Sequence, residues 1–219
     1  MKAKTLHDSA TKVKICGITS LEDALAACEA GADAIGFNFA EEAKKRCRYI
    51  EPDEARAIAA QLPPLVMVTA VCVNEPSNRL RYFLSFCDRV QLHGEEPAEQ
   101  CNNFGARAIK VFRAGPGFQI ESMRDYRVGA YLLDAWAPDA RGGTGKTLDW
   151  DIAEKAVSLG KPIILAGGLT PDNVAEAVRR VRPYAVDTAG GVESAPGKKD
   201  HAKLRSFVEN AKRALLAAG

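Results

Sequence analysis

The sequence predicts an α/β protein built as a single-domain (βα)₈ TIM barrel, and three observations support this. The chain has 219 residues, of which 47% are hydrophobic, enough for one sizeable core. Short apolar runs rich in β-forming residues alternate with longer helical patterns, which is typical of βα units on a parallel sheet. Eight such units can be counted. A doubly wound open sheet is the main alternative, but eight units in this length fit the barrel better.

Eight segments are predicted as strands because they are short, apolar and bounded by polar or turn residues. They are Val13–Cys16, Ala34–Phe39, Val66–Val73, Arg89–Leu92, Ala108–Phe112, Tyr131–Asp134, Ile163–Ala166 and Ala185–Asp187.

Helices are predicted between the strands, several with recognisable starts such as Glu51-Pro52-Asp53 and Thr170-Pro171-Asp172. They are Leu21–Glu29, Pro52–Gln61, Pro76–Phe86, Ala98–Phe104, Ile120–Tyr126, Trp150–Leu159, Asp172–Val181 and His201–Ala217. No linker or low-complexity segment divides the chain. We therefore expect a polar N-terminal extension over residues 1–12 and one barrel domain over residues 13–219.

Composition argues against several function classes. The formal net charge is only +2 and the basic residues are mostly scattered, so a nucleic-acid partner is not indicated. The six cysteines form no C-x-x-C pair and have no companion histidine spacing, so we expect reduced thiols and no metal site. No apolar run approaches the length that spans a membrane, and the N-terminus lacks the apolar core of an export signal. These features favour a cytoplasmic protein without a membrane partner.

In a (βα)₈ barrel the chemistry lies at the carboxyl ends of the strands. The side chains at or just after the predicted strand ends are therefore the candidates for a site. They are Cys16, Asn38, Asn74, His93, Arg113 and Asp134, followed by a glycine pair after each of the last two strands.

Cys16 is the first candidate for catalysis. Side chains in a strand alternate, so Lys14 and Cys16 share one face, and a nearby ammonium group favours the thiolate. A buried structural cysteine is the simpler alternative.

Asp134 closes an apolar strand, where burial favours the protonated carboxyl group that a general acid needs. The alternative role for Asp134 is a turn cap. His93 is equally compatible with a substrate contact and with a structural role.

Two glycine pairs, Gly167-Gly168 and Gly190-Gly191, follow the seventh and eighth predicted strands. The loops after these two strands form the recurrent phosphate site of barrel enzymes, and glycine lets main-chain N–H groups approach an anion. A tight turn is the alternative for each pair alone, but the two together predict a phosphorylated substrate. A third glycine-rich segment, Arg141–Lys146, is expected to form a lid, and it lacks the spacing of an ATP-binding P-loop.

These residues lie within longer motifs, and through them the chain resembles the phosphoribosylanthranilate isomerase family of tryptophan biosynthesis from Lys14 to the last helix. The motifs are Lys14–Thr19, Gly31–Phe37, Val73-Asn74, Gln91–Gly94, Leu132–Asp134, Gly142–Lys146 with Asp149-Trp150, and Leu165–Leu169. The resemblance implies an Amadori rearrangement of a phosphosugar, with Cys16 as general base and Asp134 as general acid. It implies that Arg48 holds the anthranilate carboxylate of the substrate, and it implies no cofactor.

The chain departs from the family pattern in two loops. Arg46-Cys47 precedes Arg48 where the family usually has Ser-Pro, which removes a rigid turn and adds a charge. Ala189-Gly190 stands where the family commonly has two serines, so we expect weaker phosphate binding through the main chain alone.

Other functions remain open at this stage. Another phosphosugar barrel, such as indole-glycerol-phosphate synthase or an aminoimidazole carboxamide ribotide isomerase, would share the phosphate loops but needs a lysine network or paired aspartates. Lys110 is the main lysine expected to point inward at a strand end, and the first strand ends in Cys16. A non-catalytic barrel that binds a phosphorylated ligand is a further alternative. The sequence does not distinguish a monomer from a homodimer.

Overall fold

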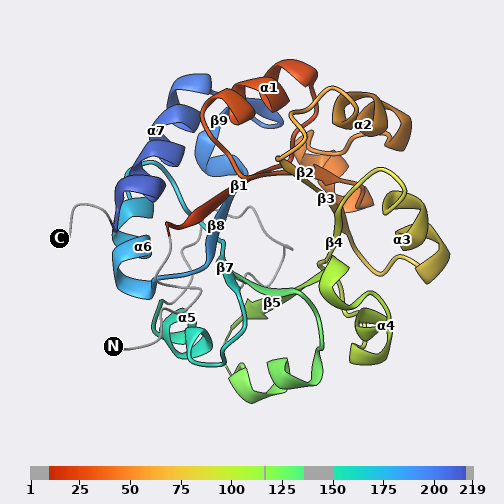
Figure 1. Cartoon of the computed structure of the whole chain (residues 1–219), viewed down its shortest axis with the longest axis vertical. Helices are drawn as coiled ribbons and strands as arrows, with labels where there is room; N and C mark the ends of the chain where they lie inside the picture. Colours follow the sequence, from red (N-terminus) through yellow and green to blue (C-terminus); the bar gives the residue numbers. More distant parts are fainter. Residues whose placement is uncertain (1–9, 116, 136–149, 216–219) are drawn as a thin grey trace.

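The computed structural model describes residues 10–115, 117–135 and 150–215, and its eight parallel strands close into a barrel surrounded by helices (Figure 1). The predicted fold class is therefore confirmed. The strands follow one another around the barrel in chain order, and β8 pairs with β1 to close it. They are β1 (Lys12–Cys16), β2 (Ala34–Asn38), β3 (Met67–Cys72), β4 (Arg89–Leu92), β5 (Ala108–Ala114), β6 (Ala130–Ala135), β7 (Ile163–Leu165) and β8 (Ala185–Thr188).

Seven α-helices in the described residues lie outside this ring (Figure 1). They are α1 (Leu21–Glu29), α2 (Pro52–Ala59), α3 (Ser77–Phe83), α4 (Ala98–Asn102), α5 (Trp150–Val157), α6 (Val174–Val181) and α7 (His201–Arg213). Short 3₁₀ helices occur at η2 (Glu41–Arg46), η3 (Gly105–Arg107), η4 (Ile120–Asp125) and η5 (Gly190–Val192). A two-stranded hairpin, β9 (Glu193–Ala195) with β10 (Lys198–Lys199), follows β8.

Two differences from the predicted elements have physical causes. The expected fifth helix is the 3₁₀ helix η4, because the segment is short and buries fully only one side chain, Met123. α6 begins at Val174 and not at Asp172, because Asn173 accepts a hydrogen bond from the Thr170 N–H and holds residues 170–173 in a turn.

Strand alternation divides the core into two layers. Val13 and Ile15 of β1 point outward and pack against the helices, while the inner layer is formed by apolar side chains of β5 to β8. These inner side chains are Ile109, Val111, Ala130, Leu132, Ile164, Ala166 and Ala185. The barrel is thus a packed core below the carboxyl ends of its strands, as expected for this fold.

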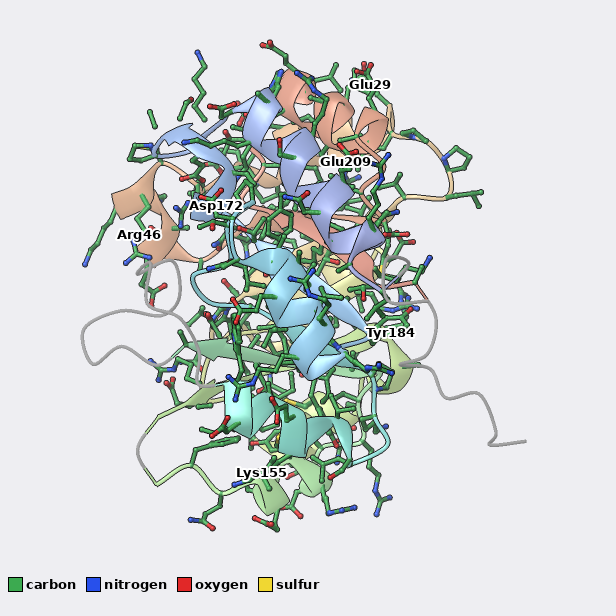
Figure 2. All side chains as sticks on the ribbon, turned by 90° about the vertical axis from the view of Figure 1, so that its left-hand side faces the viewer. Glu29, Arg46, Lys155, Asp172, Tyr184 and Glu209 are labelled. Carbon is green, nitrogen blue, oxygen red and sulfur yellow. The ribbon has the colours of Figure 1, made fainter. Side chains whose placement is uncertain are left out.

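The two ends of the barrel carry different residues. Tyr184 immediately precedes β8, and it lies on one side in Figure 2, whereas Arg46 and Asp172, from the loops after β2 and β7, lie on the opposite side. The loops that follow the strands therefore gather at one end. No helix in the part of the chain that the structure describes is long and apolar enough to cross a membrane.

Replacing Leu132 by alanine is expected to destabilise the protein by about 2–5 kcal/mol, because Leu132 is fully buried inside the barrel and its removal leaves a cavity. Leu65→Ala is the matched control, since Leu65 is 95% exposed and should change the free energy of unfolding by less than about 0.5 kcal/mol. Urea unfolding measures both values. Equal effects of the two substitutions would contradict the described packing.

Candidate active site

A cavity of about 1010 Å³ lies at the carboxyl ends of the strands. The cavity is lined by the eight residues predicted to act in catalysis or to bind the substrate: Cys16, Arg48, His93, Asp134, Gly167, Gly168, Gly190 and Gly191. Asn38 and Arg113 also line this cavity. Asn74 does not, because its side-chain amide exchanges hydrogen bonds with Glu95 in the loop after β4.

Cys16 ends β1 and lies at the floor of the cavity, beside the inward side chain of Lys14. Lys14 Nζ donates a hydrogen bond of 2.8 Å to Asp187 Oδ1 on the neighbouring strand β8, and both side chains are buried. Gly36 on β2 makes room for this group, because a Cβ at that position would lie 2.9 Å from Cys16 Sγ and 3.1 Å from Lys14 Nζ. The thiol therefore lies in a tight polar cluster formed by β1, β2 and β8.

The electrostatics of Cys16 differ from the sequence-based expectation. Burial raises the pKa of the Cys16 thiol and the charge of Asp187 raises it further, while Lys14 and Lys199 lower it; the net direction is upward. Burial alone would lower the pKa of Lys14, but Asp187 and Cys16 outweigh it and raise the value to about 12. Lys14 thus favours the thiolate as expected, but desolvation is the larger effect. The resting protein holds Cys16 mainly as a thiol at neutral pH.

Asp134 on β6 reaches the same cavity from a strand separated from β1 by β7 and β8. Its Oδ1 accepts a 2.8 Å hydrogen bond from the Ala135 N–H, and its Oδ2 lies 3.4 Å from His93 Nε2. The first contact is the local bond expected of a turn cap, and the second places the carboxyl group beside the imidazole ring of His93 within the cavity. His93 Nε2 is buried and makes no hydrogen bond of good geometry with the described residues. His93 therefore lies beside Asp134 in the cavity, a position compatible with a contact to a substrate and with a structural role.

The two glycine pairs approach each other above β7 and β8. A Cβ on Gly191 would lie 1.9 Å from Leu169 O, and the Thr188 hydroxyl donates a 2.9 Å hydrogen bond to the same oxygen. Gly167 and Gly168 have φ values of +86° and +66°, and a Cβ on Gly167 would lie 2.5 Å from Ala135 N. Glycine is thus required here by close main-chain packing, which brings the two loops together at one wall of the cavity.

The loop that carries Arg48 has a defined shape without the Ser-Pro turn. The 3₁₀ helix η2 ends at Arg46, and Cys47 follows in the left-handed conformation with φ +52°. This turn directs Arg48 over Gly17, since a Cβ on Gly17 would lie 3.1 Å from Arg48 Cδ. The guanidinium group then reaches Gly190 and forms a two-point ion pair with Glu193.

Sequence reasoning missed three buried charges beside the site. Asp187 on β8 binds Lys14, and Glu193 on β9 binds Arg48. Lys199 on β10 binds the main-chain oxygen of Cys16. One signal in the sequence was Lys14, a lysine within the apolar predicted strand Val13–Cys16. Such a lysine requires an anionic partner when the strand is buried, as it is here. The predicted lid, Arg141–Lys146, lies outside the described residues.

Comparison with known proteins points to one family. Residues 13–210 match the family model described as N-(5'phosphoribosyl)anthranilate (PRA) isomerase. The isomerase of that name from Geobacter sulfurreducens is 54% identical over 203 residues, covering 92% of this chain and 98% of the relative. The relative from Trichlorobacter lovleyi is 52% identical and covers 93% of this chain and 99% of its own length.

Solved structures give the same result. Phosphoribosyl anthranilate isomerase from Thermotoga maritima is 42% identical, with a TM-score of 0.82 over 92% of this chain and 98% of that chain. A second structure, the isomerase in complex with reduced 1-(o-carboxyphenylamino)-1-deoxyribulose 5-phosphate, is 39% identical with a TM-score of 0.79, over 92% of this chain and 98% of that chain. On its sequence and its fold, the chain belongs to the N-(5'-phosphoribosyl)anthranilate isomerase family.

Proposed function

We propose that this chain catalyses the Amadori rearrangement of N-(5-phosphoribosyl)anthranilate to 1-(o-carboxyphenylamino)-1-deoxyribulose 5-phosphate in tryptophan biosynthesis. The observation that carries this proposal is the shared cavity of Cys16 and Asp134, bounded by the glycine loops after β7 and β8. A thiol and a carboxyl group on different walls are suited to moving protons at two atoms of one small substrate. Family membership supports the same reaction.

The reaction needs one acid and one base. Asp134, in its protonated form, donates a proton to the furanose ring oxygen, and the ring opens to a Schiff base. The Cys16 thiolate then removes the proton from C2, which gives an enolamine that tautomerises to the ketone product. Each step is a proton transfer to or from a positioned side chain.

Two further contacts hold the substrate. Main-chain N–H groups of the loops at Gly167-Gly168 and Gly190-Gly191 bind the phosphate, consistent with the close approach that the glycines allow there. Arg48 binds the anthranilate carboxylate through guanidinium N–H groups. Arg46 and Lys45 line the same cavity and add positive charge for a substrate that carries two anionic groups, a phosphate and a carboxylate.

An indole-glycerol-phosphate synthase would need a lysine network, and the described residues of this cavity do not form one. Lys110 was expected to point inward, but it points away from the cavity and is bound to Glu96 Oε2 at 2.6 Å and to Gly94 O at 2.8 Å. Lys14 is inward, but it is bound to Asp187. Lys45 lines the cavity from η2, in the loop that follows β2, and not from a strand. The cavity therefore favours acid–base chemistry at Cys16 and Asp134.

Cys16→Ala and Asp134→Asn are each expected to lower kcat by about 10²–10⁴-fold, the usual contribution of a general acid or base. Cys28→Ala in α1 and Asp125→Asn in η4 are matched controls, because both residues lie outside the cavity. Steady-state kinetics with purified substrate measure the change, and thermal unfolding checks the fold. A Cys16 or Asp134 variant that keeps kcat within about threefold would remove that residue from its role.

Complementation separates the enzyme from a non-catalytic binder. The wild-type chain should restore growth without tryptophan in a bacterial strain that lacks the isomerase, and the Cys16→Ala chain should not. A binder that has lost turnover would fail in both forms.

The rate at which iodoacetamide alkylates Cys16 should follow the titration of this thiol, because the thiolate is the reactive form. Because the pKa of the Cys16 thiol is raised, the thiolate fraction grows as pH rises, so the alkylation rate, followed by mass spectrometry of the Cys16 peptide, should increase from neutral to alkaline pH. Lys14→Met removes a cation that favours the thiolate, so the rising limb of alkylation should move to higher pH. Asp187→Asn removes an anion that opposes the thiolate, so the limb should move to lower pH. Lys12→Met, at the other end of β1, should not move it; shifts of the opposite sign would contradict the described charges around Cys16.

Thr188→Val tests the pairing of the two glycine loops. The substitution removes the hydrogen bond to Leu169 O, and we expect KM to rise by roughly fivefold, equivalent to about 1 kcal/mol, with kcat nearly unchanged. Thr11→Val is the control, because Thr11 is buried before β1 and its hydroxyl has no hydrogen-bond partner among the described residues. An unchanged KM for Thr188→Val would argue against these loops as the phosphate site.

A further inference from the structure

The β9–β10 hairpin is tied to three loops at the mouth of the barrel. At its turn, Gly197 has φ +78°, and a Cβ there would lie 1.9 Å from Cys47 O in the loop after β2. The Thr19 hydroxyl, in the loop after β1, donates a 3.1 Å hydrogen bond to Gly197 O. The hairpin itself continues the loop after β8. It therefore connects the loop that follows Cys16 with the loops that carry Arg48 and Gly190.

The first residue of this hairpin, Glu193, holds Arg48 at two points. Arg48 Nε donates to Glu193 Oε1 and Arg48 Nη2 donates to Glu193 Oε2, both at 2.8 Å. The side chains are 12% and 6% exposed, so water weakens this pair little. Among the described residues, Arg48 Nη1 has no hydrogen-bond partner. One edge of the guanidinium group is thus fixed by the protein and the other remains for an anion.

Lys199, the last residue of the hairpin, fixes Glu193 in turn. Its ammonium group has no exposed surface and donates to three oxygens: Cys16 O at 2.8 Å, Glu193 Oε1 at 3.0 Å and Ala189 O at 3.1 Å. Lys199 therefore links three parts of the site: the main chain at Cys16, the main chain at Ala189 just before Gly190, and the carboxylate of Glu193.

The charge state of Glu193 argues against an acid–base role for it. Burial by itself raises the pKa of Glu193, but hydrogen bonds and charges of Arg48 and Lys199 outweigh it and lower the pKa below its ordinary value. The carboxylate is therefore ionised at neutral pH, and both of its oxygens already accept hydrogen bonds.

We propose that Glu193, fixed by Lys199, is a positioning residue that presents Arg48 to the carboxylate of the substrate. This inference rests on the proposed function for the identity of the substrate. An arginine side chain that is free in solution loses conformational freedom when a ligand orders it, and this loss weakens binding. The ion pair with Glu193 orders Arg48 before the substrate arrives, so binding of the carboxylate is stronger.

The test compares two ligands by calorimetry: reduced 1-(o-carboxyphenylamino)-1-deoxyribulose 5-phosphate, and the same compound without the carboxyl group. Glu193→Gln should weaken binding of the first ligand by about tenfold and leave the second within about twofold. In an Arg48→Met background, Glu193→Gln should have no further effect on the first ligand, because it acts through Arg48. Glu209→Gln, an exposed glutamate on α7 that is labelled in Figure 2, is the matched control.

Each outcome decides the proposal. If Glu193→Gln weakened the binding of both ligands equally, or weakened binding as much in the Arg48→Met background as in the wild type, Glu193 would be a merely structural residue and the inference would be overturned. Failure of the wild type to bind the first ligand would also overturn it. Should Glu193→Gln not fold, Glu193→Asp keeps the charge but shortens the side chain, and it should weaken only the carboxylated ligand. Absence of turnover by a wild type that shows the expected binding pattern would overturn the proposed function alone.

Discussion

The pairing of β8 with β1 closes the barrel and brings the ends of distant strands together at one cavity. At this seam Lys14 of β1 meets Asp187 of β8 at 2.8 Å, and Cys16 lies two residues further along β1. The glycine loops after β7 and β8 reach the same cavity only because the sheet is closed. Burial at the seam raises the pKa of Cys16, so the structure that positions the thiol also limits its ionisation.

Much of the barrel could be predicted because its signals are local. Eight apolar runs separated by helical patterns indicated the strands, and strand alternation placed Lys14 and Cys16 on one shared face, which in the structure is the inner one. The rule that chemistry lies at strand ends then selected Cys16, His93 and Asp134, which share one cavity. The same rule failed for Asn74, whose side chain binds the next loop at Glu95. Position at a strand end does not determine where a side chain points.

The remaining features depend on contacts between distant residues, which no local pattern reports. Arg48 and Glu193 are 145 positions apart, and Cys16 and Lys199 are 183 apart. The β9–β10 strands are short and largely polar, so their sequence does not have the apolar alternation of a strand. The dominance of desolvation over the charge of Lys14 likewise required the burial of Cys16 to be known. The sequence indicated the chemical groups, and the fold determined their ionisation and orientation.

A crystal structure of this protein with reduced 1-(o-carboxyphenylamino)-1-deoxyribulose 5-phosphate would show whether a thiol and a carboxyl group act on one bound phosphosugar. Cys16 Sγ should lie roughly 3–3.5 Å from C2 of the ligand, as a reacting pair requires, with Asp134 facing the oxygen on C4. The phosphate should accept hydrogen bonds from the main chain of both glycine loops. A ligand bound with Cys16 or Asp134 out of reach of these atoms would contradict the proposed acid and base roles.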